Sequence, residues 1–244
     1  MMSKTGSIIF AIWLVAVLAA SPCSRAQDDD AFDDYLDGEE EMTMVADPLE
    51  SVNRVFYHFN DKLHAWILNP VAKGYRAVVP EEFRIATRNV FENMRMPKRF
   101  VNCLLQGKLK ASGTELLRFV VNSTIGVAGI EDVAGDELGI KAQREDTGQT
   151  LGGYGIGEGI YITWPILGPS NLRDSVGFVG DMLLDPITWL VPNIYARGGI
   201  RTEEVVNGTS LRIGEYEKTQ AAALDHYESL KDMYTQYRQE QIKR

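Results

Sequence analysis

The sequence predicts a mainly α-helical domain, and three features support this prediction. Apolar residues recur at steps of three and four over several segments, which places them on one face of an α-helix. Prolines precede several of these segments, where the first turn of a helix tolerates them. Extended patterns are limited to a glycine-rich tract between residues 126 and 168, which predicts loops and one short extended segment.

Residues 1–26 predict an export signal that is not part of the fold. Residues 8–20 are an unbroken apolar run after a short basic start. This run is shorter than the roughly 20 residues that span a bilayer, and it has the length of a signal-peptide core. Two cleavage sites are open: after Ala26, or before Cys23 in a lipobox-like stretch that would leave a lipidated cysteine. Pro22 is unusual before a lipidated cysteine.

Residues 27–46 hold nine acids and no base, which predicts a disordered acidic spacer. Setting these nine aside from the 34 acids, and Lys4 and Arg25 from the 25 bases, leaves 25 acids against 23 bases. A nearly neutral body argues against nucleic-acid binding, which needs a basic surface. We expect the folded domain at residues 47–238 and a short tail at 239–244.

The first helix is expected to begin at Asp47, as its N-cap, and to end at Asn69–Pro70. One face of this helix is apolar throughout: Leu49, Val52, Phe56, Phe59, Leu63 and Trp66. Further helices are expected to start at Pro80 and at Pro97, and a fourth to cover residues 109–125. Its stretch 116–121 is apolar almost all round, which predicts burial or contact with lipid.

Helices resume near Ser170, where Asp174, Asp181 and Asp185 are expected to cap helices or form buried ion pairs. A long final helix is expected from Thr202 to Arg238, with a break near residues 207–208 as an alternative. No apolar run after the signal reaches 18 residues. Periodicity alone favours apolar faces that pack on one another in a soluble domain, over faces that lie in a membrane interface.

The sequence contains no complete catalytic, metal-binding or nucleotide-binding motif. Its three histidines are scattered, at positions 58, 64 and 226. The stretch 168–172 begins like a nucleophile elbow, but Leu172 stands where the second glycine is required. Cys103 lies in an apolar stretch and is expected to be a buried free thiol. We therefore expect no enzyme, no cofactor and no metal site.

Three stretches in the same order resemble one family. Residues 47–54, with the sequence DPLESVNR, and Phe59–Asn60 resemble its opening motif. Residues 118–135 resemble its central motif, and residues 151–174 its glycine-rich signature. The family is that of the MlaA/VacJ phospholipid-transport lipoproteins of Gram-negative outer membranes, and the resemblance extends from residue 47 to about residue 238.

The resemblance implies a ring-like bundle of amphipathic helices with a glycine-rich irregular segment, seated in the periplasmic leaflet of the outer membrane. It implies that an amphipathic channel lets mislocalised phospholipids leave the outer leaflet, which maintains lipid asymmetry. The implied partners are phospholipids, a trimeric outer-membrane porin and a soluble periplasmic lipid carrier, with no cofactor. This implication reverses the preference for a soluble domain. A soluble periplasmic scaffold and a phospholipase are the alternatives.

The resemblance also singles out residues. Phe59 and Asn60 match a stretch that governs gating in the family, and His58 departs from the usual asparagine there. Asn122, Arg173 and Asp174 are expected either to line the channel or to fix helix packing. Residues in and near the glycine-rich stretch are expected to contact porin or lipid: Tyr154, Tyr161, Trp164 and Leu167.

Overall fold

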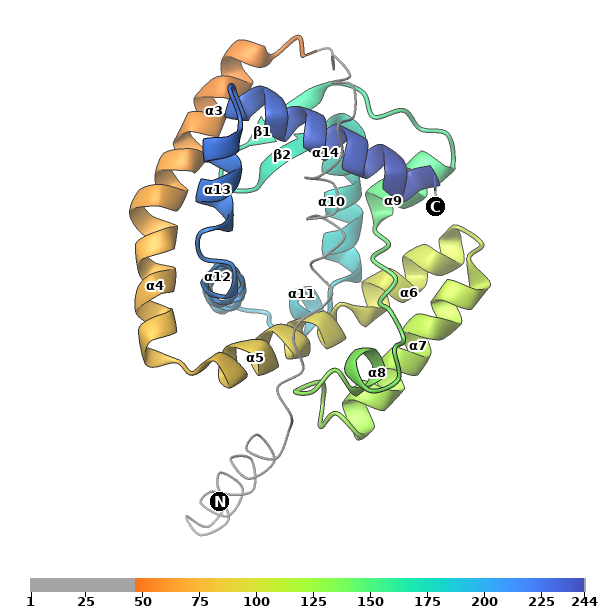
Figure 1. The fold of residues 1–244 in the computed structure, drawn as a ribbon. Helices are drawn as coiled ribbons and strands as arrows, with labels where there is room; N and C mark the ends of the chain where they lie inside the picture. The colour runs from red at the N-terminus through yellow and green to blue at the C-terminus, as the bar shows by residue number, and fades with distance from the viewer. Residues whose placement is uncertain (1–46, 244) are drawn as a thin grey trace. The chain divides into compact units, whose positions relative to one another are not determined.

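A computed structural model describes residues 47–243 of the chain. The expected export signal, Cys23 and the whole acidic spacer at residues 27–46 lie outside the described residues. The described residues fold into helices with one two-stranded sheet (Figure 1), which confirms the predicted mainly α class.

The first helical segment is longer than the sequence predicts. Helix α3 (Glu50–Leu63) continues through a π-helical segment, η1 (His64–Leu68), into α4 (Asn69–Val78). The predicted end at Asn69–Pro70 is therefore wrong. Proline lacks an amide hydrogen and clashes with the carbonyl four residues before it in an α-helix. Here the amide of Asn69 donates to the carbonyl of His64, five residues back, and this wider turn admits Pro70 without ending the helix.

The prediction that Asp47 is the N-cap of the first helix is also wrong. Helix α3 begins at Glu50, and the Asp47 carboxylate accepts hydrogen bonds from the amide of Leu49, at 3.1 Å, and from Nδ2 of Asn53, at 2.8 Å. Asp47 thus stabilises the turn that leads into α3 rather than the first turn of the helix.

The next three helices agree with the predictions. Helix α5 (Glu81–Met94) starts directly after Pro80 and has Glu81 and Glu82 in its first turn, where acids are favoured by the helix dipole. Helix α6 (Met96–Leu105) carries Pro97 in its first turn, and α7 (Leu109–Thr124) follows after a turn at Gly107.

The glycine-rich region contains more regular structure than was predicted. Two short helices, α8 (Val133–Asp136) and α9 (Thr147–Gly153), are capped by the side chains of Asp132 and Asp146. Strands β1 (Tyr161–Trp164) and β2 (Gly168–Asn171) form an antiparallel hairpin, with Tyr161 opposite Asn171. Helix α10 (Leu172–Leu184) follows directly, and Asp185 caps α11 (Pro186–Leu190), as predicted for that aspartate.

The single final helix predicted for residues 202–238 is wrong. The region forms α12 (Ile194–Leu211), α13 (Glu215–Ala222) and α14 (His226–Lys243). The first break falls at Gly214, whose φ of 96° is accessible to glycine but costly for other residues. Asn207 lies inside α12, where its Nδ2 donates to the carbonyl of Arg84 on α5. Helix α14 continues to Lys243, beyond the expected domain end at residue 238.

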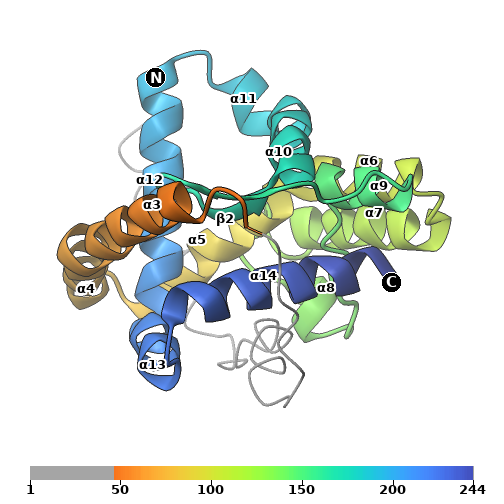
Figure 2. The same ribbon diagram turned by 90° about the horizontal axis from the view of Figure 1, so that it is seen from above.

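The elements of the unit contact one another in a closed circuit. From α3 the circuit passes through η1, α4, α12, α5, α6, α9 and α14 to the hairpin, and the hairpin contacts α3 again. Figure 1 shows this ring-like arrangement, with α12 seen end-on inside it. Figure 2 shows α11 and the first half of α12 on one side of the band formed by α3 to α7, and α13 and α14 on the other. The circuit confirms the ring-like bundle that the resemblance implies.

Candidate functional site: a buried polar framework

The described unit has an inverted distribution of polar and apolar side chains. On α3, Phe59 is 48% exposed while Asn53 is 1% exposed, and Trp66 of η1 is 73% exposed. Large apolar side chains are exposed on most of the helices, including Leu116, Leu117 and Val120 within the apolar stretch of α7. The soluble packing that periodicity alone favours is therefore wrong: these faces do not pack on one another.

Polar and charged side chains occupy the interior instead. Glu115 of α7 is completely buried, and one of its carboxylate oxygens lies 2.6 Å from Nε of Arg99 on α6. Its other oxygen accepts a hydrogen bond from the amide of Gln143. Arg99 also donates to Glu92 of α5, at 2.8 Å, so one buried guanidinium joins three successive helices. A buried charge is tolerated only when it is paired and hydrogen-bonded in this way.

Asp174 lies at the centre of the most extensive network. Its carboxylate accepts hydrogen bonds from Nε of Arg238 at 2.8 Å, Nε of Arg173 at 2.9 Å and the hydroxyl of Tyr234 at 2.7 Å. Arg238 also makes a bidentate pair with Asp146, at 2.7 and 2.9 Å. We call these five residues the Asp174 network. The network fastens α14 to α9 and α10, and so closes one side of the circuit.

The charges of the Asp174 network determine its pKa values. Burial raises the pKa of the Asp174 carboxyl, but hydrogen bonds from Arg238 and Arg173 more than offset this and hold it at about 2. The pKa of Asp146 is lowered for the same reason by Arg238, whose own pKa is raised by its two carboxylates against the effect of burial. Asp174, Asp146 and Arg238 are therefore all ionised near neutral pH, whereas burial and Asp174 raise the pKa of the Tyr234 hydroxyl, which stays neutral.

Two glycines let α9 and α10 approach each other closely enough for this network to form. A Cβ on Gly148 would lie 2.4 Å from Oδ1 of Asp174, and a Cβ on Gly177 would lie 2.5 Å from the backbone nitrogen of Gly148. The two glycines therefore let α9 and α10 come together, and any side chain at either position would force the helices apart.

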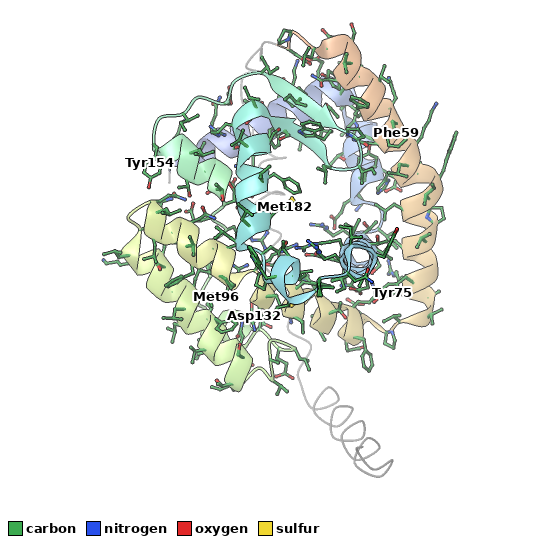
Figure 3. The ribbon with its side chains drawn as sticks, turned by 180° about the vertical axis from the view of Figure 1, so that it is seen from behind. Phe59, Tyr75, Met96, Asp132, Tyr154 and Met182 are labelled. Atoms are coloured by element: carbon green, nitrogen blue, oxygen red, sulfur yellow. The ribbon has the colours of Figure 1, made fainter. Side chains whose placement is uncertain are left out.

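A second network lies between α7 and α8. The Asp132 carboxylate accepts hydrogen bonds from Arg118, at 2.6 Å, and from Nδ2 of Asn122, at 2.7 Å. Oδ1 of Asn122 in turn accepts from the amide of Ala134, at 2.9 Å. Asp132 is labelled in Figure 3. Asn122 thus joins α7 to α8, and Arg173 and Asp174 join α10 to neighbouring elements in their own network. That these three residues line the channel stays a prediction.

Two asparagines on α3 hold the hairpin. Nδ2 and Oδ1 of Asn53 bond the carbonyl of Tyr161 and the amide of Thr163, at 3.1 and 2.8 Å. Two turns along the helix, Asn60 donates to the carbonyl of Trp164 at 2.9 Å and accepts from the amide of Ile166 at 2.7 Å. The two asparagines therefore form hydrogen bonds with backbone groups of the hairpin that a third strand would otherwise form.

The end of the hairpin stores backbone strain. Ile166 has a φ of 70°, a left-handed conformation that β-branched residues rarely adopt. Its amide is held by Asn60, and its side chain is 75% exposed. Strain of this kind persists only where the surroundings impose it, and it gathers at functional sites. Asn60 therefore holds the strained turn of the hairpin against α3, whereas its neighbours His58 and Phe59 are exposed. The gating role of these three residues stays a prediction.

The residues expected to contact porin or lipid divide into two groups. Tyr154, Trp164 and Leu167 are exposed, and Tyr154 lies at the outer edge of the unit in Figure 3. Tyr161 is buried, 3% exposed, in an aromatic cluster with Tyr57 and Tyr227, so the prediction that it contacts a partner directly is wrong. Strand alternation explains the difference, because Tyr161 and Trp164 are three residues apart and face opposite sides of the hairpin.

Sequence reasoning gave no site role to several residues of these networks: Asn53, Arg99, Glu115, Asp146 and Arg238. The pairing Asp146–Arg238 joins residues 92 positions apart, so no local pattern signals it. Cys103 is buried, as predicted, and burial raises the pKa of its thiol to about 11. Within residues 47–243 no cluster of three or more metal-binding side chains is present, and none of the described helices is both long and apolar enough to span a membrane.

Comparison with known proteins agrees with this architecture. The family model described as MlaA lipoprotein matches residues 45–241. The chain belongs to the MlaA lipoprotein family. It is similar to a solved structure from a study of how bacterial outer-membrane lipid asymmetry is maintained, with a TM-score of 0.72 and 29% identity over 81% of this chain and 99% of that one.

Several relatives in the MlaA family are named intermembrane phospholipid transport system lipoprotein MlaA. The proteins from Shigella flexneri and Escherichia coli are each 38% identical over 149 residues, which is 59% of this chain and 59% of theirs. The protein from Haemophilus influenzae is 31% identical over 181 residues, 73% of this chain and 67% of its own. The chain thus matches less than two thirds of the length of the first two relatives.

Proposed function

We propose that this protein transports phospholipids and removes them from the outer leaflet of the outer membrane, so that lipid asymmetry is maintained. The proposal rests on the inverted distribution of polar and apolar side chains. Exposed apolar helix faces suit the acyl chains of a bilayer, and buried polar groups inside a closed circuit suit a charged headgroup. A headgroup that crosses an apolar layer without polar partners loses its hydration at a cost of several kcal/mol. A polar path through the circuit lowers that cost.

The proposed location is the periplasmic leaflet of the outer membrane. Short helices with exposed apolar faces bind a membrane interface without spanning it. A lipid on Cys23 would add to this anchoring, and an acidic spacer would separate the anchor from the folded unit. The proposed partners are a porin trimer, against exposed residues such as Tyr154, Trp164 and Leu167, and a soluble periplasmic carrier that accepts the lipid.

Transport of this kind needs no catalytic group. The hydroxyl of Ser170, the serine in the stretch that begins like a nucleophile elbow, lies 3.2 Å from the hydroxyl of Ser175 and 3.3 Å from the carbonyl of Asn171. Neither partner is a general base that could activate a nucleophile. We therefore propose that phospholipid leaves this protein chemically unchanged. Incubation with phospholipid vesicles should release no fatty acid and no lysophospholipid.

The decisive experiment deletes the gene and measures phospholipid on the cell surface. A membrane-impermeant amine reagent labels aminophospholipids in the outer leaflet, and their amount should rise on deletion and return to normal when the wild-type gene is restored. Asn60→Ala, which removes the two bonds from α3 to the hairpin turn, should alter the surface level, whereas Lys73→Ala, at an exposed position on α4, should not. Unchanged labelling after deletion would rule out the transport function.

A further inference from the structure

Helix α13 is attached to the rest of the described unit without an apolar face of its own. None of its side chains is buried, and its sequence, EYEKTQAA, has no apolar stripe. The elements whose extensive contacts close the ring do not include it. A helix of eight residues is marginal in water by itself. The position of α13 therefore depends on specific side-chain contacts.

Polar contacts hold α13 against the long helical segment formed by α3, η1 and α4. The hydroxyl of Tyr216 and Nε2 of Gln220 each donate to Oδ1 of Asp61 on α3, both at 3.0 Å. Nδ2 of Asn69 on α4 donates to the carboxylate of Glu217. Figure 1 shows α13 beside α3, between α12 and α14. All three hydrogen bonds are only partly buried, so water can replace them when α13 moves away.

Tyr216 is the main anchor of α13. Its ring centroid lies 4.3 Å from that of His64 on η1 and 5.3 Å from that of His226, the first residue of α14. Burial and the Asp61 carboxylate raise the pKa of the Tyr216 hydroxyl, so this group remains a hydrogen-bond donor well above neutral pH. One side chain thus supplies both an aromatic contact and a hydrogen bond to a charged acceptor.

Both ends of α13 allow it to move while the helices beside it in the chain stay in place. Gly214 precedes it with a φ of 96°, and the residue after it is extended. On one side, Nη1 of Arg84 donates to the carbonyl of Ser210 near the end of α12, at 2.9 Å. On the other side, Arg54 of α3 pairs with Asp225 just before α14, at 3.0 Å. The neighbouring helices therefore have anchors that do not involve α13.

The acceptor of two of these bonds, Asp61, lies at a special place in the chain. It directly follows Asn60, which holds the hairpin turn, and both residues are in the last turn of α3. The π-helical segment η1 begins three residues later. Such π turns within α-helices are frequent at functional sites. The end of α3 therefore fastens two separate elements, the hairpin turn and α13.

We propose that α13 is a strap that detaches from α3 and η1 while the ring stays closed. In the closed state Tyr216 covers Asp61 and His64, and in the open state these two side chains face solvent. Opening exposes little apolar surface, because α13 buries none, so it requires less free energy than unfolding of α12 or α14. The detachment of α13 does not depend on the transport function.

Hydrogen exchange measured by mass spectrometry on the purified full chain in dodecyl maltoside micelles tests the strap. The amides of residues 218–222 should exchange at least about tenfold faster than those in the middle of α14, because local opening exposes them without unfolding the ring. Equal protection of α13 and α14 would show that the two helices open together, and would overturn the strap.

A tyrosine variant tests the anchor without removing its ring. Tyr216→Phe loses the bond to Asp61 and should speed exchange in α13 about 3–10-fold, while exchange in α14 and Tm stay unchanged. Tyr195→Phe, at an exposed tyrosine on α12, is the matched control and should leave α13 unchanged. Asp61→Ala should also speed exchange in α13, and adding Tyr216→Phe to it should have no further effect, because the acceptor is already gone. Equal acceleration in all helices would contradict the strap.

Chemical labelling of histidine detects the open state independently. Diethyl pyrocarbonate should modify His64 several times faster in Tyr216→Phe than in the wild type, because the ring of Tyr216 leaves His64 more often. His58, exposed on α3, is the internal control and should react at the same rate in both proteins. An unchanged rate at His64 would show that α13 does not control access to it, and the strap would be refuted.

Discussion

Replacing Arg238 by glutamine should destabilise the protein more than any exposed arginine substitution. The guanidinium donates at 2.7–3.0 Å to Asp146 and Asp174, and its side chain is only 9% exposed. Glutamine cannot satisfy both carboxylates, so Asp146 would lose its ion pair and Asp174 would keep only the one with Arg173. Breaking a buried pair by removing one partner costs about 3–5 kcal/mol. For a unit of this size, that loss lowers Tm by about 6–20 °C.

Circular dichroism in detergent micelles, followed through thermal and urea unfolding, measures this loss. Arg54→Gln is the matched control, because Arg54 also joins carboxylates, Glu50, Asp225 and Glu228, but is about one third exposed. Exposed pairs contribute about 0–1 kcal/mol. The reasoning is refuted if the two substitutions have the same effect.

A second substitution in the same background tests the mechanism of the loss. If the damage comes from an unpaired buried charge, Asp146→Asn should restore part of the stability of Arg238→Gln, because it removes one of the two charges. In the wild-type background the same Asp146→Asn change should be destabilising. Equal damage from Asp146→Asn in both backgrounds would show that the two sites are not coupled.

Three further outcomes follow from the contacts described above. Gly148→Ala should cost about 2 kcal/mol or more, because its Cβ would lie 2.4 Å from Oδ1 of Asp174; unfolding in urea measures the loss. Asn60→Ala should speed hydrogen exchange at the amide of Ile166, whose bond to Oδ1 it removes, while global stability changes little. The pKa of Asp174 is about 2 in the folded protein, against about 3.9 in an unfolded chain. Its ionised form therefore stabilises the fold above about pH 4 by about 2–3 kcal/mol, and Tm measured between pH 4 and pH 2 should fall less steeply in Asp174→Asn.

The parts of the fold that depend on local chemistry could be predicted from the sequence. Pro80 and Pro97 mark helix starts because the beginning of an α-helix tolerates proline, and Glu81 and Glu82 agree with the helix dipole there. Pro70 misled the prediction, because a π turn that admits a proline has no signal in the residues around it. The breaks between α12, α13 and α14 were placed wrongly because Asn207, a residue typical of turns, is held inside α12 by the carbonyl of Arg84.

The candidate site was harder to predict, for two physical reasons. Periodicity shows that Phe59 and Asn53 lie on different faces of one helix, but it does not say which face meets a packed interior. The resemblance supplied that information, together with Asn60, Asn122 and Asp174. The partners of those residues come from distant parts of the chain: Arg238 reaches Asp174 across 64 positions. Such pairs depend on closure of the circuit, which a single sequence does not reveal.

Helix α14 joins parts of the described unit that lie far apart along the chain. The hydroxyl of Tyr227 bonds Asp47, a residue 180 positions earlier, and Arg238 completes the Asp174 network from the same helix. Bringing distant segments together costs chain entropy that only the finished contacts repay. Helix α10 also closes the ring, because it contacts α6, α9 and the hairpin. Loss of the α14 contacts alone would therefore leave the ring closed.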